Sequence, residues 1–425
     1  MNALKAQTST PKTEFSPRFA ATLEGRHRTG VVWSVVFLSS TIIGIVFLTL
    51  LIYTILNQSS GYVAIQNKVD PATLSINGVA LEDLKHDDLV RILQGNVSKG
   101  LFRQLEREKP MVERTRDEVY DLILEDVLQP QVVGTWSLME SLLNGAVIRE
   151  DVARQYPQAE LSFITWLKPN FITSSQSSDP LKAGVRTAIL GSLWTIIVTF
   201  VVAFPLGVGA AIYLEEYAAN NWLNRALQTN INNLAGVPSI IYGMLGLALF
   251  VRGLEPLTSG KLFGFTDPTT ANGRTILSAG FTLALLVLPL IIINGQEAIR
   301  AVSNSLRQGS YGLGATKWQT VWHHVLPNAI PGILTGTILA ISRAIGETAP
   351  LVVVGAATFI TMDPNGPFSK FTTLPIQIYQ WTARPQDEFR NLAAAAILVL
   401  LLLLLSLNAV AILFRNRYSR SRSVE

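Results

Sequence analysis

Long uncharged runs of apolar residues recur along this chain, and more polar stretches separate them. A membrane helix needs about 20 such residues, and continuous runs of this length fall at 31–56, 187–214, 231–251, 275–293 and 392–414. A sixth run, 329–360, is interrupted only by Arg343 and Glu347. Backbone groups in lipid must pair within their own segment, and the runs lack the alternation of barrel strands. We therefore expect six transmembrane helices in an all-α integral membrane protein.

The composition supports a membrane protein and limits the disulfide and metal chemistry that the chain can carry. Of the 425 residues, 49% are hydrophobic and only 15% are charged, which is unusual for a soluble chain of this size. The chain has no cysteine, which excludes disulfides and metal sites with thiolate ligands. Its four scattered histidines are a poor set of ligands for a metal. We expect no metal and no cofactor bound by this chain.

The two ends of the chain set the expected orientation. Segment 1–30 and tail 415–425 are both basic, and positive-inside bias places such segments in the cytoplasm. The run 31–56 is too long for a secretory signal, so we interpret it as a retained anchor. The sequence thus predicts a multi-pass cell membrane protein, inner or plasma membrane, with both termini cytoplasmic.

Residues 57–186 differ from the rest of the chain and form an expected extracytoplasmic insertion. Val119, Leu122, Ile123 and Val127 have helical spacing in a charged stretch, which predicts a mainly helical domain. SSQSSDP, at 174–180, is typical of a linker into the next span. The insertion is either a docking surface for an external partner or a tolerated cap on the outer face.

The remaining core, 187–414, contains a patterned loop at 294–328 that the orientation places in the cytoplasm. Its first part can form a polar helix that ends near Gly309. Its second part places an apolar stripe on one helix face, and we expect Pro327 to end that helix before the next span. The stripe comprises Trp318, Val321, Trp322 and Val325. By periodicity alone, this helix could enter a groove on another protein or lie in the headgroup layer.

Spacing within the loop resembles the EAA loop of ABC importer permeases. Gly314 lies twelve residues before Leu326, which Pro327 follows. The chain departs from the family pattern by having Gln308, Gly309 and Ser310 for Glu-Ala-Ala, and His324 for isoleucine. The resemblance implies a coupling loop for a partner ATPase, formed by Gln308, Gly309, Ser310, Gly314, Ala315, Trp318, Trp322, Leu326 and Pro327.

Longer stretches of the sequence indicate which ABC importer permeases the chain resembles. GVPSIIYG and RAIGETAP, within 232–247 and 310–352, are similar to strings of phosphate ABC importer permeases of the PstA family, as are 183–218 and 372–389. This implies a permease subunit of an ATP-driven importer for inorganic phosphate, forming half of the pathway. The implied partners are a PstC-like permease, a PstB-like ATPase dimer and a PstS-like phosphate-binding protein. The sequence has no basic stripe with interleaved aromatic residues, so we expect no nucleic-acid partner. A permease of the same fold for sulfate or molybdate remains the alternative.

Arg343 and Glu347 raise a separate physical question, because charges within a bilayer are penalised unless they face water or a partner. They are four residues apart, so they share one helix face and can reach each other. Arginine suits phosphate oxygens through paired hydrogen bonds, and the resemblance implies this arginine in phosphate passage. We place Arg343, Glu347 and Thr348 on the expected pathway. An ion pair that only pins the helix is the alternative.

We expect the ATP that drives transport to be hydrolysed by another subunit. No G-x-x-x-x-G-K-[ST] loop occurs; SGKL at 259–262 lacks the upstream glycine and the following hydroxyl residue. The runs also lack a cluster of acid and base residues, so an integral membrane enzyme is disfavoured. ATP and magnesium are therefore assigned to the partner ATPase.

Overall fold

The structure is a computed structural model that describes residues 17–76, 78–265, 272–356 and 359–420. Residues 1–54 and 55–425 form two units. The first unit consists, in its described part, of most of helix α1 (Pro17–Gln58), which contains the expected anchor 31–56. The predicted segments 1–30 and 415–425 lie partly outside the described residues.

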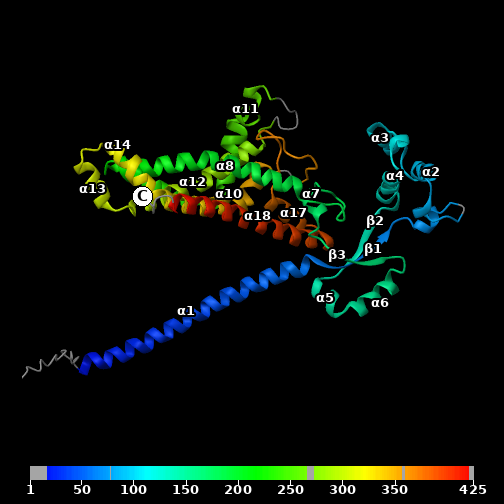
Figure 1. Ribbon diagram of the computed structural model, residues 1–425, viewed down its shortest axis with the longest axis horizontal. Helices are drawn as coiled ribbons and strands as arrows, with labels where there is room; N and C mark the ends of the chain where they lie inside the picture. Colours follow the sequence, from blue (N-terminus) through cyan, green and yellow to red (C-terminus); the bar gives the residue numbers. More distant parts are fainter. Residues whose placement is uncertain (1–16, 77, 266–271, 357–358, 421–425) are drawn as a thin grey trace, which may run out of the picture. The chain divides into compact units, whose positions relative to one another are not determined.

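Within the described residues, five helices are long and apolar enough to cross a membrane: Gly25–Gln58, Arg186–Tyr217, Ile276–Arg300, Lys317–Gly346 and Asp387–Arg417. Four of them belong to the second unit, where α8 (Arg186–Ile212), α12 (Ile276–Arg300) and α15 (Leu326–Gly346) pack together and α18 (Asp387–Arg420) packs on α15 (Figure 1). Their apolar runs bury a shared core that includes Ala203, Leu283, Val287 and Ala340. The expected helical membrane fold is confirmed.

Shorter helical segments connect these helices. They are η5 (Tyr213–Tyr217), α9 (Trp222–Ala235), α10 (Ser239–Gly246), η6 (Leu247–Gly253), α11 (Glu255–Thr258), η7 (Lys261–Phe263), α13 (Asn304–Gly312), α14 (Lys317–Thr320), η8 (Val321–Val325), α16 (Ala349–Val354) and α17 (Leu374–Thr382).

The run 231–251 is not the straight span that the sequence suggested. Helix α9 and the helix over Ser239–Gly253 meet at an angle of 107°. Gly236 ends the first helix and Pro238 begins the second. Proline cannot donate a backbone hydrogen bond, so the chain turns here. The six predicted spans correspond, in the described residues, to five continuous helices and this bent pair.

Two glycines of α10 allow close helix packing. A Cβ added at Gly246 would lie 2.1 Å from Oγ1 of Thr282 on α12. One added at Gly243 would lie 2.7 Å from Cα of Pro350 on α16. No side chain fits at these distances, so α10 contacts both neighbours through its backbone.

The insertion contains a sheet that the sequence did not predict. Strands β1 (Ser60–Asn67), β2 (Pro130–Thr135) and β3 (Glu160–Thr165) form an antiparallel sheet in the order β2-β1-β3. Ser60 pairs with Thr165 and Val63 with Thr135. These partners are far apart in sequence, and no local period records such pairing. The expectation of a mainly helical domain was therefore incomplete.

Helices nevertheless make up most of the insertion. They are η1 (Pro71–Leu74), η2 (Leu81–Asp83), α2 (His86–Asn96), α3 (Lys99–Glu108), η3 (Met111–Glu113), α4 (Arg116–Ile123), η4 (Leu124–Leu128), α5 (Leu138–Leu143), α6 (Gly145–Gln155) and α7 (Pro169–Thr173). Val119, Ile123 and Val127 are buried together in a core between α2, α3 and α4, which confirms the helical spacing read from the sequence.

The sheet is joined to the permease core by a continuous buried cluster. Val63 of β1 and Trp166 after β3 pack with Trp381 of α17 and Phe389 of α18. The predicted linker 174–180 is also packed: Gln176 is buried, and its Oε1 accepts a hydrogen bond from the backbone N–H of Ile360 at 3.0 Å. The interpretation of this segment as a linker was wrong, because tertiary contacts fix it.

Candidate translocation and coupling sites

The ion pair between Arg343 and Glu347 lies where a long helix breaks. Helix α15 ends at Gly346, and Glu347 is extended, with φ −76° and ψ 122°. The proline ring of Pro350 would clash with the carbonyl of Gly346 in a continuous helix, so α16 starts separately at Ala349. The expectation that both charges lie within one helix was wrong for Glu347. Their contact still forms, with Nε of Arg343 3.3 Å from Oε1 of Glu347.

Burial is unequal across this pair. The Arg343 side chain is 47% exposed and that of Glu347 only 18%. Within the described residues no other ion pair to Arg343 occurs. Thr348 lies in the break and is half-buried. A half-exposed guanidinium in a membrane segment requires water, an anion or a partner chain.

Two interrupted spans meet at this point. Gly243 of α10 lies directly against Pro350 of α16, and α10 follows the bend at Gly236. Both breaks therefore belong to one packed region of the chain. Interrupted membrane helices supply polar backbone ends within the bilayer, where substrate sites can form.

The loop between α12 and α15 forms a compact helical turn. Gly314 has φ +84°, a left-handed conformation that glycine adopts without strain. Thr316 then caps α14 through a reciprocal capping box with Gln319. Across the turn, the hydroxyls of Ser310 and Thr320 are 2.9 Å apart and buried. The expected helix ending near Gly309 is instead two helices, because α12 stops at Arg300 and α13 spans Asn304–Gly312.

Pro327 does not end the helix that precedes it. The chain stays helical from Lys317 to Gly346, and the π-helical turn Val321–Val325 lies just before the proline. Such turns change the backbone pairing locally, which explains how a proline is accommodated here. The expected helix end was wrong for this reason.

The predicted apolar stripe divides into two parts. Val321 and Val325 are buried. Trp318 and Trp322 are exposed and stack on each other, with ring centroids 5.3 Å apart and an interplanar angle of 18°. Of the other predicted coupling residues, Gln308, Gly309 and Gly314 are exposed, whereas Ala315, Leu326 and Pro327 are half-buried.

Sequence reasoning missed the ion pair that holds α13. Arg307 contacts Glu216 of η5, with Nη2 2.8 Å from Oε1 and side chains only 14% and 7% exposed. The same guanidinium donates to the carbonyl of Ile299 in the last turn of α12 and to that of Val302 just after the helix. The adjacent acidic residues Glu215 and Glu216 were the only feature of the sequence that pointed to this ion pair. No local pattern indicates which basic residues they contact.

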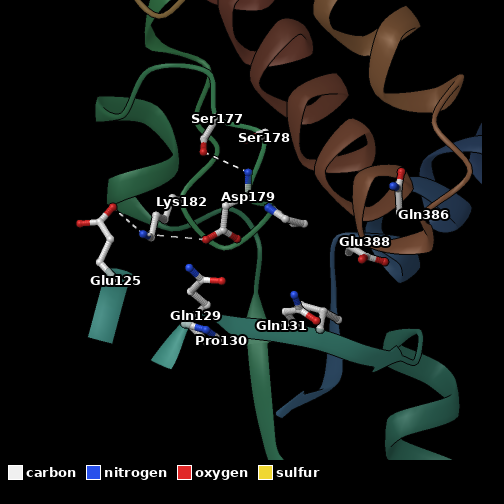
Figure 2. A pocket seen from close by; sticks show the side chains of 12 residues that line it. Glu125, Gln129, Pro130, Gln131, Ser177, Ser178, Asp179, Lys182, Gln386 and Glu388 are labelled. Carbon is white, nitrogen blue, oxygen red and sulfur yellow. Dashed lines mark hydrogen bonds and ion pairs between the residues drawn. The ribbon is translucent and has the colours of Figure 1, made fainter. Parts of the chain in front are cut away.

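One sizeable cavity lies where the insertion meets the start of α18. It has a volume of about 680 Å³ and is lined by η4, β2, the segment before α8 and the start of α18 (Figure 2). Lys182 pairs with Glu125 and Asp179 at its wall, and Glu388 also lines it. Three carboxylates against one ammonium make this cavity unsuitable for an oxyanion.

Comparison with known proteins identifies the family. Residues 203–421, just over half of the chain, match the family described as binding-protein-dependent transport system inner membrane component. The probable ABC transporter permease protein YqgI of Bacillus subtilis is 31% identical over 240 residues, covering 56% of this chain and 76% of that protein.

Two further relatives are named for phosphate. The phosphate transport system permease protein PstA 1 of Mycobacterium tuberculosis is 35% identical, covering 48% of this chain and 61% of that protein. The phosphate transport system permease protein PstC of Xylella fastidiosa is 36% identical, covering 41% and 56% respectively. The chain is thus a member of the binding-protein-dependent ABC importer permeases, a membrane-embedded transporter subunit and not an enzyme.

Proposed function

We propose that this chain is a permease for inorganic phosphate and forms half of the translocation pathway with a second permease. The observation that carries the proposal is the half-exposed Arg343 at the junction of two interrupted spans. Its support comes from the relatives named as phosphate permeases, both PstA and PstC.

The geometry of Arg343 suits transient binding of an oxyanion. Its contact with Glu347 uses Nε, so the two terminal nitrogens can donate to an anion. Phosphate carries between one and two negative charges near neutral pH, and arginine can offer it two parallel hydrogen bonds. Glu347 holds the guanidinium when no anion is present. Competition between the carboxylate and the anion keeps binding weak, as a conduit requires. Thr348 adds a hydroxyl beside the pair.

The coupling loop supplies the link to ATP hydrolysis in this proposal. The stacked Trp318–Trp322 pair and the exposed residues around Gly314 form the surface for a PstB-like ATPase dimer, which binds ATP and magnesium. Aromatic side chains of this kind are typical anchors of protein interfaces. A PstS-like protein delivers phosphate from outside, and both termini of this chain lie in the cytoplasm. Closure of the ATPase then shifts the permease pair between two states.

The test is ATP-dependent uptake of labelled phosphate by vesicles containing the complete complex. Arg343→Ala is compared with the native chain and with Arg390→Ala. Arg390 is a matched control because it also pairs locally, with Asp387 at 3.1 Å, but lies at the start of α18. Assembly of each complex is measured separately by co-purification of the ATPase.

We expect phosphate uptake that resists competition by sulfate, loss of uptake in assembled Arg343→Ala complex, and retention in Arg390→Ala complex. Uptake that persists in Arg343→Ala complex would reduce Arg343 to a helix-pinning residue. Uptake of sulfate or molybdate in place of phosphate would assign the pathway to another oxyanion.

A further inference from the structure

An apolar stripe on the α5–α6 hairpin is left uncovered by the rest of the described chain. Leu142 and Leu143 are 69% and 75% exposed, and Met139 and Val147 are also exposed. Met139, Leu142 and Leu143 have the spacing i, i+3 and i+4 and therefore share one side of α5 (Leu138–Leu143), and Val147 follows in the first turn of α6. An exposed apolar cluster of this kind indicates a contact surface.

The opposite side of the hairpin is already occupied. Ile148 and Val152 of α6 are buried against Ala64 of β1. Ser141 of α5 is buried too, and its hydroxyl accepts a hydrogen bond from the backbone N–H of Tyr62 at 2.8 Å. The hairpin is thus fixed on the sheet, and its apolar stripe is directed away from it.

One hydrogen bond fixes the depth of α5 relative to the end of α1. Oδ1 of Asn57 accepts from the backbone N–H of Met139 at 2.7 Å, and Asn57 is the first polar residue after the uncharged run 31–56. That run of 26 residues is about 39 Å long as a helix, enough to cross a hydrocarbon core of about 30 Å. Asn57 therefore lies at the edge of the hydrocarbon core or in the headgroup layer just outside it.

Helix α5 has 6 residues and is about 9 Å long. Since its first turn is bonded to Asn57, its whole length lies within about 9 Å of that depth. The headgroup layer of one leaflet is roughly 5 to 8 Å thick. Whichever way α5 points, Leu142 and Leu143 lie at or near this layer.

We propose that the stripe Met139, Leu142, Leu143 and Val147 inserts into the membrane leaflet at which α1 ends, as an interfacial lipid contact. The charges near it have no basic excess, with Glu140, Glu150 and Asp151 against Arg149 and Arg154. Binding therefore depends on apolar contact and needs no anionic lipid. The contact would hold the sheet and its attached helices at a fixed height over the permease core.

The test uses a single fluorescent label, which the absence of cysteine in the native chain makes direct. Leu142→Cys and the control Val112→Cys are each labelled with an environment-sensitive dye in the assembled transporter, in phosphatidylcholine nanodiscs. Val112 is a suitable control because it is apolar, 90% exposed and part of the same insertion. Quenching is measured with a shallow spin-labelled lipid and with aqueous iodide. Val147→Cys provides a second label site if Leu142→Cys does not fold.

We expect the label at position 142 to be quenched by the spin-labelled lipid at least about threefold more than the label at position 112, and to be shielded from iodide. Equal access of iodide to both labels would overturn the proposal. Shielding of position 142 from both quenchers would also overturn it, because a protein partner would then cover the stripe.

Discussion

Arg307 and Glu216 form a buried ion pair that joins the coupling loop to the end of the second membrane helix. Arg307 also donates to two carbonyls, one in the last turn of α12 and one just after it. One side chain therefore connects α13, η5 and α12. Movement imposed on the loop by an ATPase would reach both helices through this residue, so coupling is expected to depend on it.

Removing Arg307 should weaken both the fold and the coupling. Arg307→Ala leaves Glu216 buried and unpaired, which costs about 3 kcal/mol. We expect a lower unfolding temperature in detergent and loss of transport-linked ATPase stimulation. Arg390→Ala is the control, since Arg390 and its partner Asp387 are both largely exposed. Exposed pairs contribute about 1 kcal/mol or less. Equal effects of the two substitutions would contradict this assignment.

Removing Trp318 should affect assembly more than folding. The ring is exposed and stacks only on Trp322 in the described part of the chain, so Trp318→Ala should change the free energy of unfolding by about 0.5 kcal/mol or less. Loss of an interface tryptophan typically costs about 2 kcal/mol or more of binding free energy. Titration of the cognate ATPase onto the reconstituted permease measures this. Trp33→Ala, another exposed tryptophan but within α1, should leave ATPase affinity unchanged.

Two glycine substitutions should have opposite signs. Gly243→Ala places a methyl 2.7 Å from the backbone of Pro350, and such overpacking costs about 1 to 3 kcal/mol. Gly209→Ala lies in α8 with nothing within 4 Å of the added Cβ, and gains up to about 1 kcal/mol of helix propensity. Thermal unfolding of the two purified variants tests this. A destabilised Gly209→Ala variant would show that position 209 is packed in the assembly.

Acid should loosen the α3–α4 region of the insertion. The hydrogen bond from Lys109 and that from the backbone N–H of Thr115 lower the pKa of Glu118. The folded pKa is thus below the unfolded value, so the stabilisation is present above the unfolded pKa and is lost as pH falls through the folded pKa. Protection of the α4 amides, measured against their intrinsic exchange rates, should fall below about pH 4.3, near the usual pKa of glutamate. Glu118→Gln should remove this pH dependence, whereas an unchanged profile in that variant would assign it to other carboxylates.

The loop 294–328 shows which features local sequence predicts correctly and which it does not. The spacing from Gly314 to Leu326 and Pro327 located the turn, since a left-handed residue and a capped helix are locally encoded. The same reasoning failed at Pro327, where a π-helical turn lets the helix continue. It also grouped Val321 with Trp322, although packing buries one and leaves the other exposed.

The sequence by itself determined that this is a helical membrane protein, because the length of an uncharged run must match the thickness of a bilayer. It also predicted the contact between Arg343 and Glu347, which forms although Glu347 lies just past the end of α15 and not within it. Only the tertiary structure decided the three-stranded sheet, the 107° bend, and the pairing of Arg307 with Glu216. These features depend on contacts between residues distant in sequence, whose free energy is set by packing and burial that no local pattern records.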